Sequence, residues 1–146
     1  MIYANSDGGA RGNPGPGAIG VIIRKEGEII IRHREFLGQR VTNNQAEYLG
    51  LIKALEIGSK ITKNLTCILD SELVVKQLLG EYKVKNPELL KLFLKVQKLQ
   101  ERFEKIKYLH STRWDKFQKI ADELVNEELN KRGYRKKNRF YKYKKR

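Results

Sequence analysis

Four acidic side chains occupy positions where folded proteins often present chemistry. They are Asp7 at the end of a short predicted strand, Glu47 one turn inside a predicted helix, Asp70 at the end of another strand, and Asp122 in the first half of the last helix. Converging carboxylates oppose one another's ionisation, and hard divalent cations relieve that opposition. Two such ions can stabilise the attacking and leaving oxygens of phosphodiester cleavage. Any one of these acids alone is more typical of a solvated group or a helix cap.

A row of small residues accompanies one of these acids. Glu47, Gly50, Ala54 and Gly58 recur at intervals of three and four, so they share one face of the predicted helix. Such a face lets the helix lie close to a sheet or to a ligand beside Glu47. On this pattern alone, a close-packing face without catalytic meaning is equally expected.

The stretch from residue 5 to residue 17, NSDGGARGNPGPG, places five glycines and two prolines around Asp7. Glycines permit close approach of the backbone to a ligand, and prolines stop a helix and stiffen the return into the next strand. A dinucleotide-binding loop needs its glycines at a different spacing, G-x-G-x-x-G, and a helix after them. Here the spacing differs and a strand follows, so dinucleotide binding is excluded. The pattern favours amides and Asn13 lying along a sugar-phosphate backbone, although Gly-Pro loops are often simple turns.

The elements that must position these residues follow from apolar periodicity and from capping residues. The predicted strands are residues 1–6, 18–24, 28–37, 65–70 and 105–110, and the predicted helices are residues 43–58, 71–80, 87–103 and 117–131. The order is three strands, a helix, a strand, two helices, a strand and a helix. This order predicts an α/β fold with a five-stranded mixed sheet and helices on both faces.

The composition of the chain indicates its cellular compartment and the class of its binding partner. The chain of 146 residues has a formal net charge of +14, which makes a polyanion the leading partner class. No apolar run approaches the roughly 20 residues of a membrane span, and no secretory signal is visible at the N-terminus. The single cysteine, Cys67, excludes an intrachain disulfide. We expect a cytoplasmic, monomeric protein without membrane association.

Most of the basic excess lies at the C-terminus. Residues 131–146 contain ten Lys or Arg and no acid, and the remainder holds 21 bases against 17 acids. We therefore divide the chain into a domain, residues 1–131, and a basic aromatic tail, residues 132–146. Basic side chains neutralise phosphates and aromatics stack on bases, which favours nucleic-acid contact over a merely solubilising end. The predicted tail contacts are Arg135, Lys136, Lys137, Arg139 and Tyr141.

Four blocks in this order resemble the ribonuclease H type 1 family. They are DGGARGNPGPGAIG, TNNQAEYLGLIKAL, DSELVVKQLLGEYKVKN and IADELVNEEL, and the likeness extends from residue 1 to about residue 131. The resemblance implies a ribonuclease H-like fold and hydrolysis of the RNA strand of RNA/DNA hybrids, leaving 5′-phosphate and 3′-hydroxyl ends. It also implies two Mg²⁺ ions, with Mn²⁺ as a substitute. Asp7 and Asp70 would be central ligands, Glu47 would serve one ion, and Asp122 the other.

The same resemblance assigns contacts to the substrate. The glycine loop and two asparagines would read 2′-hydroxyls and bases in the minor groove, which distinguishes RNA from DNA. An asparagine and a threonine would grip a phosphate of the DNA strand. The residues concerned are Gly8, Gly9, Gly12, Asn43 and Asn44 for the first role, and Asn13 and Thr42 for the second.

The chain departs from the family in three places. Glu72 stands where many members have glutamine, and an acid there is unfavourable for contact with a phosphate. The short segment between the third and fourth acids leaves no room for the basic helical protrusion of some members. His110 matches the loop histidine that assists proton transfer or product release, in a loop about two residues longer than usual. A partly buried structural histidine is an equally weighted interpretation of His110.

Three other functions are compatible with the pattern. Some family members also cleave double-stranded RNA. A protein that binds hybrids or structured RNA without cutting would rely on its tail, although the presence of all four acids argues against it. A nuclease module of a retroelement polyprotein is a further hypothesis, whereas the start at Met1 and the full set of blocks favour a free-standing protein.

Overall fold

The computed structural model describes residues 1–112 and 114–134. The predicted tail contacts at residues 135–141 therefore lie outside the described residues. The elements are β1 (Ile2–Ala10), β2 (Gly15–Lys25), β3 (Glu28–Val41), α1 (Asn43–Gly58), β4 (Asn64–Leu69), α2 (Glu72–Leu78), α3 (Pro87–Gln100), β5 (Lys105–His110) and α4 (Lys116–Lys131).

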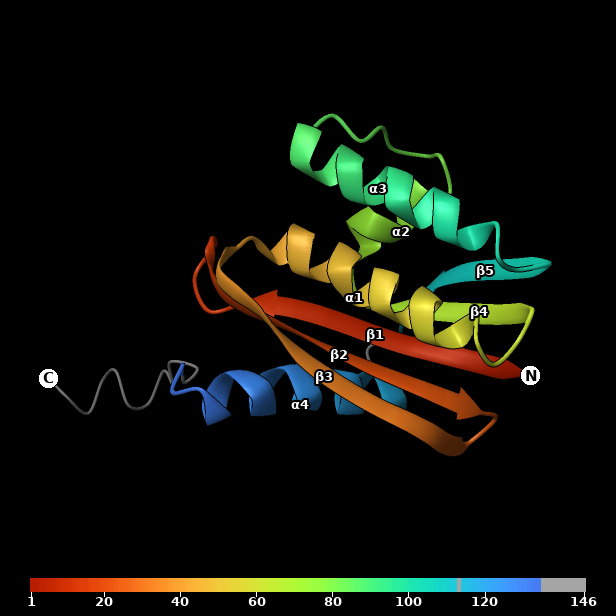
Figure 1. The fold of residues 1–146 in the computed structure, drawn as a ribbon, viewed down its shortest axis with the longest axis horizontal. Helices are drawn as coiled ribbons and strands as arrows, with labels where there is room; N and C mark the ends of the chain where they lie inside the picture. Colours follow the sequence, from red (N-terminus) through yellow and green to blue (C-terminus); the bar gives the residue numbers. More distant parts are fainter. Residues whose placement is uncertain (113, 135–146) are drawn as a thin grey trace, which may run out of the picture.

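The five strands form one mixed sheet in the order β3-β2-β1-β4-β5. The pairs β1–β2 and β2–β3 are antiparallel, whereas β1–β4 and β4–β5 are parallel. Helices α1, α2 and α3 lie over one face of the sheet and α4 lies under the other (Figure 1). The predicted fold class, with helices on both faces of a five-stranded mixed sheet, is confirmed.

Two apolar layers hold the helices to the sheet. The larger layer lies under α1 and α3 and includes Tyr48, Leu51 and Val96, none of which is measurably exposed. The smaller layer joins α4 to β2 through Ile22 and Ala121. None of the helices in the described part of the chain is long and apolar enough to cross a membrane.

The helix boundaries follow the expected capping residues. Thr42 caps α1 with a full capping box, in which its hydroxyl oxygen accepts from the Gln45 N–H at 3.1 Å. Ser71 caps α2, and Pro87 begins α3. Residues 79–86, between α2 and α3, contain no helix, in agreement with the expected lack of a protrusion. The helix predicted to reach residue 103 ends at Gln100, and Phe103 packs against the core beyond it.

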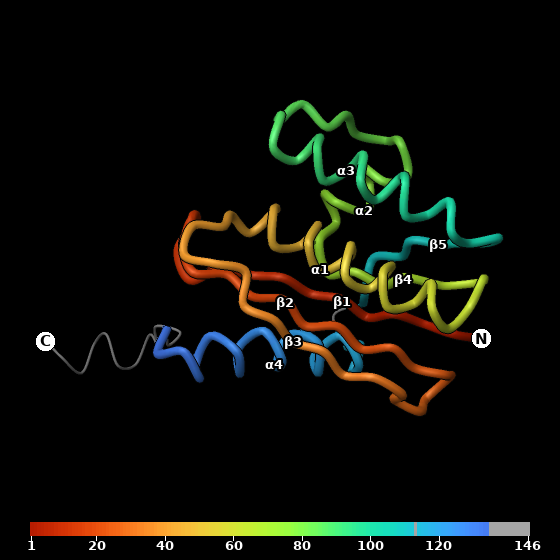
Figure 2. Tube along the Cα trace, viewed as in Figure 1, coloured from red at the N-terminus to blue at the C-terminus, as the bar shows by residue number. Residues whose placement is uncertain are grey.

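β1 is longer than the sequence pattern predicts. The strand continues through Gly8 and Gly9 to Ala10, because β2 offers it antiparallel partners as far as Gly17. The carboxylate of Asp7 therefore projects from within a paired strand rather than from a loop. The connection that remains is short, and Asn13–Pro14 within it is a cis peptide bond. Figure 2 shows this connection at the same end of the molecule as the start of α1 and the end of α4.

A buried polar network fixes α4 against the strands one turn before Asp122. The Gln118 amide accepts from Asn5 Nδ2 at 3.1 Å and donates to the carbonyl of Ser6 at 2.8 Å. The Arg24 guanidinium donates to Asn5 Oδ1 at 2.9 Å and lies between the rings of Tyr3 and Phe117. Buried amides that satisfy one another in this way specify a single register for the helix.

We expect Gln118→Leu to destabilise the fold by about 2–4 kcal/mol, because it leaves a buried amide and a buried carbonyl without partners. Urea unfolding of the variant beside wild type measures this difference. Lys119→Ala, at the exposed neighbouring position, serves as the control and should stay within about 0.5 kcal/mol of wild type. Equal midpoints for Gln118→Leu and wild type would contradict the proposed role of the network.

Candidate active site

A cleft of about 1050 Å³ opens where β1, the start of α1, the end of β4 and α4 come together. The structure brings all four predicted acids into it. Residues lining the cleft include residues 7–12, Asn43, Asn44, Glu47, Asp70, Ser71, Asp122 and Asn126. Residues far apart in sequence thus present carboxylates, amides and backbone N–H groups to one space.

Close backbone packing places Glu47 beside Asp7. A Cβ atom added to Gly8 would lie 2.0 Å from the carbonyl oxygen of Ala46, so only glycine lets β1 approach α1 this closely. The Gly8 N–H donates to Glu47 Oε1 at 2.8 Å. The predicted small row contributes to the same packing, since Gly50 faces the carbonyl of Asp7.

The second oxygen of Glu47 is an exception among buried polar atoms. Oε2 is buried and has no hydrogen-bond partner among the described residues. Such atoms are rare, and each calls for an explanation such as an ion or a ligand. A divalent cation that accepts oxygen ligands fits this position.

The electrostatics of the two buried acids, Asp7 and Glu47, also favour a bound cation. Burial, followed by the neighbouring carboxyl groups of Glu47 and Asp122, raises the pKa of Asp7 well above its ordinary value. Burial also raises the pKa of Glu47, and the charge of Asp70 adds to this effect. A bound cation would relieve the same repulsion.

Asp70 is more exposed than Asp7 and Glu47, and it directly follows the last residue of β4. Ser111 Oγ donates to its carboxylate at 3.3 Å. His110 Nε2 lies 3.0 Å from the backbone carbonyl oxygen of Asp70. Because a carbonyl oxygen can only accept a hydrogen bond, Nε2 of His110 carries the proton. The structure thus places the predicted histidine next to the third acid, on the last residue of β5, with its side chain exposed.

Asp122 belongs to a chain of polar contacts that the sequence analysis missed. Asn126, one turn later on α4, donates to Asp122 Oδ2 at 3.4 Å. The Arg11 guanidinium in turn donates to Asn126 Oδ1 at 2.7 Å. Gly20 of β2 pairs with Asp7 across the sheet. A Cβ atom added to Gly20 would lie 2.3 Å from the backbone oxygen of Ala121, so glycine at this position lets α4 lie close to the sheet. These contacts set how far Asp122 lies from the strands.

The predicted substrate-contact asparagines also connect the loop to α1. Asn13 Oδ1 accepts from the Asn43 N–H at 2.9 Å, and Asn43 Oδ1 accepts from the Ala10 N–H at 3.0 Å. A second cleft of about 310 Å³ adjoins them and is lined by Asn13, Thr42, Asn43, Asn44, Gln45, Asn86, Glu88 and Leu89. Asn86 was not predicted as a site residue, and its side chain caps α3.

Glu72 is directed into an ion pair of its own helix. Its carboxylate lies 3.0 Å from Lys76 Nζ, and that contact lowers the pKa of Glu72. The acid that departs from the family pattern is therefore partly neutralised.

Among residues 1–112 and 114–134, no group of three or more His, Cys, Asp or Glu side chains is arranged so that it could hold a metal ion. Mg²⁺ keeps several of its waters and commonly takes only one or two carboxylates, so it does not require a group of three. The donor set of carboxylates, with one unpartnered buried oxygen, has the chemistry that this ion prefers.

Comparison with known proteins agrees with this architecture. A family model described as reverse transcriptase-like matches residues 5–128. Ribonuclease HI of Halobacterium salinarum is 37% identical over 130 residues, 88% of this chain and 64% of that protein. The bifunctional protein Rv2228c of Mycobacterium tuberculosis is 40% identical over 110 residues, 73% of this chain and 30% of that protein. The chain thus spans less than two thirds of these relatives.

A solved structure gives a fuller match. LC11-RNase H1, crystallised in complex with an RNA/DNA hybrid, is 40% identical and superposes with a TM-score of 0.81, covering 90% of this chain and 98% of that one. Fold and cleft together define a ribonuclease H-like domain. The chain belongs to the ribonuclease H type 1 family.

Proposed function

We propose that this domain hydrolyses the RNA strand of RNA/DNA hybrids with two divalent ions, preferably Mg²⁺ and alternatively Mn²⁺, leaving 5′-phosphate and 3′-hydroxyl ends. The observation that carries the proposal is that four carboxylates, from β1, α1, α4 and the end of β4, line one cleft in which a buried oxygen of Glu47 has no partner among the described residues. The similar LC11-RNase H1, which binds an RNA/DNA hybrid, supports the choice of substrate.

The roles of the acids follow from their surroundings. Asp7, whose pKa is raised by burial and by its acidic neighbours, and the more exposed Asp70 would be the central ligands, because both line the cleft. Glu47 would offer its unpartnered oxygen to one ion, and Asp122 would serve the other. When bound, two such ions stabilise the attacking and leaving oxygens of an in-line displacement.

Other groups bind and orient the substrate. The backbone of the glycine loop with Asn43 and Asn44 would contact 2′-hydroxyls and base edges, because these groups line the cleft next to the acids. Asn13 and Thr42 would hold a phosphate of the DNA strand in the adjoining cleft. His110, exposed beside Asp70, would exchange protons with solvent near the leaving group.

The experiment is cleavage of an end-labelled RNA strand paired with DNA, paired with RNA, or left single, with and without Mg²⁺, beside Asp70→Asn. We expect Mg²⁺-dependent internal cuts in the hybrid that the variant lacks. Cuts in the RNA duplex would add that substrate to the class. Tight hybrid binding with no cuts in any Mg²⁺ or Mn²⁺ concentration would overturn the proposal in favour of a binding protein.

A further inference from the structure

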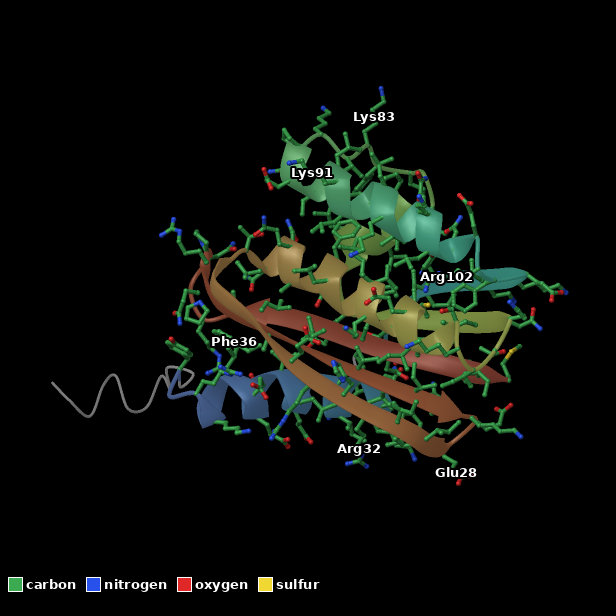
Figure 3. All side chains as sticks on the ribbon, viewed as in Figure 1. Glu28, Arg32, Phe36, Lys83, Lys91 and Arg102 are labelled. Atoms are coloured by element: carbon green, nitrogen blue, oxygen red, sulfur yellow. The ribbon has the colours of Figure 1, made fainter. Side chains whose placement is uncertain are left out.

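Arg11 is the only cation among the described residues that line the cleft of the four acids. Other cations such as Lys83 and Lys91, on the layer of α3, project away from the sheet (Figure 3). The backbone N–H of Arg11 donates to the carbonyl of Pro16 at 2.8 Å, across the connection between β1 and β2. The guanidinium of Arg11 therefore extends into the cleft wall from a fixed point of the backbone.

The Arg11 guanidinium is held by three acceptors at the C-terminal end of α4. It donates to Asn126 Oδ1 at 2.7 Å and to Asn130 Oδ1 at 3.2 Å. It also donates to the carbonyl oxygen of Tyr134, just beyond the helix. A guanidinium presents its N–H donors in a rigid planar fork, so several acceptors together leave it one orientation. Arg11 thus joins the glycine loop to one face of α4.

The helix end that supplies these acceptors is itself fixed. The Tyr134 N–H donates to the carbonyl of Leu129 at 2.9 Å, and the Gly133 N–H to that of Asn130 at 3.0 Å. This pair of bonds is a Schellman motif, which ends α4 in a defined direction. The Tyr134 ring stacks on Phe36 of β3 with the ring centroids 6.1 Å apart.

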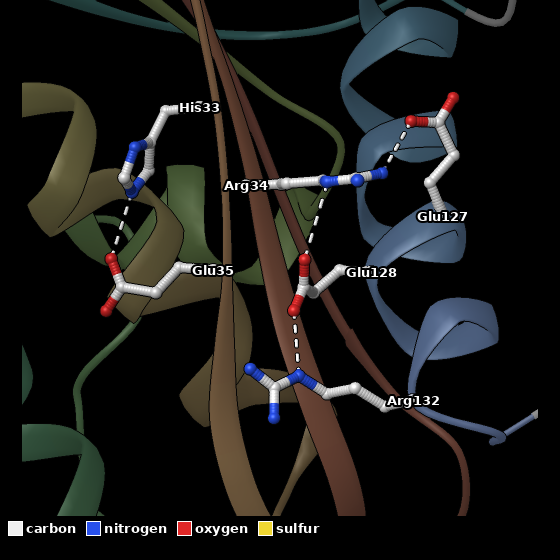
Figure 4. Close-up of polar contacts among 6 residues, drawn as sticks. All are labelled: His33, Arg34, Glu35, Glu127, Glu128 and Arg132. Carbon is white, nitrogen blue, oxygen red and sulfur yellow. Dashed lines mark hydrogen bonds and ion pairs between the residues drawn. The ribbon is translucent and has the colours of Figure 1, made fainter.

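Ion pairs attach the same end of α4 to β3. Glu128 lies between two arginines, 3.4 Å from Arg34 Nε and 2.8 Å from Arg132 Nε (Figure 4). Because Glu128 is buried, with 6% of its surface exposed, this attachment is more than a transient surface pairing. The acceptors of Arg11 therefore belong to a rigid part of the molecule.

The Asn126 amide connects Arg11 to Asp122. Because a guanidinium can only donate, its contact with Asn126 turns the amide oxygen toward Arg11 and leaves the NH₂ group for another acceptor. Asn126 Nδ2 donates to Asp122 Oδ2 at 3.4 Å, one turn earlier on the same helix face. The carboxyl group of Asp122 also neighbours Asp7 and contributes to the raised pKa of Asp7. An exposed aspartate is thereby held between an oriented amide and the buried acid of β1.

We propose that Arg11 and Asn126 are positioning residues: Arg11 sets the orientation of the Asn126 amide, and that amide holds the Asp122 carboxylate toward Asp7. The inference rests on the proposed function, in which Asp122 serves one of the two ions. Groups that hydrogen-bond to metal ligands orient those ligands, and losing one typically lowers metal affinity or activity about 10–100-fold. Asn130 supplies a matched control, because it also accepts from Arg11 but lies two turns, about 12 Å, from Asp122.

The first test is the χ1 rotamer of Asp122, measured by NMR from three-bond couplings in the protein without metal or substrate. We expect one dominant rotamer in wild type and averaged couplings in Asn126→Ala and Arg11→Met. Asn130→Ala and Arg32→Met, at an exposed arginine of β3, should keep the wild-type couplings. If Arg11→Met does not fold, Asn126→Ala decides the result. Averaged couplings in wild type, or unchanged couplings in Asn126→Ala, would overturn the proposal.

The second test is a double-mutant cycle on cleavage of an RNA/DNA hybrid at saturating Mg²⁺. We expect Asn126→Ala to lower kcat about tenfold with little change in KM, because the amide acts on a metal ligand and not on the substrate. In the Asp122→Asn background the same substitution should change kcat less than about twofold. Equal effects in the two backgrounds would overturn an action through Asp122. A wild type that cleaves nothing would contradict the proposed function alone, because the rotamer measurement still decides the positioning role.

Discussion

Asp7→Asn should lower the rate of hybrid cleavage by about 10³-fold or more and, at the same time, raise the melting temperature of the metal-free protein. The loss corresponds to about 4 kcal/mol of transition-state stabilisation, which is within the range that metal-assisted catalysis supplies. The gain in stability follows from the electrostatics of the cleft. Burial, Glu47 and Asp122 raise the pKa of the Asp7 carboxyl, so its ionised form opposes folding.

The sign of the stability effect is set by linkage. Between the ordinary aspartate pKa of about 3.9 and the raised pKa of Asp7, the folded protein binds more protons than the unfolded chain, so stability falls as pH rises through this window. Above the ordinary aspartate pKa, the metal-free wild type therefore carries an electrostatic penalty from Asp7. Each unit by which the pKa is raised corresponds to about 1.4 kcal/mol, and the amide variant removes that penalty.

Thermal unfolding in EDTA at neutral pH measures the effect, and about 4 °C is expected per kcal/mol for a domain of this size. Glu104→Gln, exposed at the opposite end of the sheet, is the control and should melt with wild type. Added Mg²⁺ should stabilise wild type and leave Asp7→Asn almost unchanged, because a ligand that binds only the folded state raises its stability. A metal-free Asp7→Asn protein that melts below wild type would contradict this electrostatic account.

Gly8→Ala should destabilise the fold by about 3 kcal/mol or more, whereas Gly9→Ala should change it by less than about 1 kcal/mol. A methyl group at residue 8 would lie 2.0 Å from the Ala46 oxygen and 2.7 Å from the Glu47 nitrogen, both backbone atoms that cannot rotate away. Overpacking against backbone forces the helix to shift. At residue 9 the nearest atom is Val125 Cγ1 at 3.7 Å, an ordinary contact.

Urea unfolding of the two neighbouring variants gives the comparison. We also expect Gly8→Ala to lose most of its activity, because moving α1 away from β1 breaks the 2.8 Å bond that holds Glu47. A Gly8→Ala protein that does not fold agrees with the prediction as long as Gly9→Ala folds. Equal midpoints for the two variants would show that the close approach of β1 and α1 is not what positions Glu47.

The sequence alone predicts the parts of the site that rest on local patterns. Thr42 marks the start of α1, which it caps. The spacing of Glu47 and Gly50 predicts a helix face that packs closely against its neighbour, and in the structure this face lies against Asp7. The five-stranded mixed sheet with helices on both faces also follows from periodicity and element order, whereas the order of the strands within the sheet does not.

Contacts between distant residues could not be predicted in this way. Arg11 meets Asn126 across 115 positions of sequence, and Asn5 meets Gln118 across 113, because α4 crosses beneath β1 and β2. No local spacing encodes such a crossing. Tyr134 is a similar case: Gly133 marks the helix end, but its partner Phe36 is known only once β3 is placed.

The most direct test of the central claim is the initial rate of RNA-strand cleavage in a hybrid by Asp122→Asn and by its neighbour, Glu123→Gln, at saturating Mg²⁺. Both variants remove one exposed carboxylate from the same turn of α4, and Asp122 but not Glu123 is among the residues that line the cleft. We expect a loss of about 10²-fold or more for Asp122→Asn and less than about twofold for Glu123→Gln. Equal rates for the two variants would contradict the claim that the four gathered acids form the reaction centre.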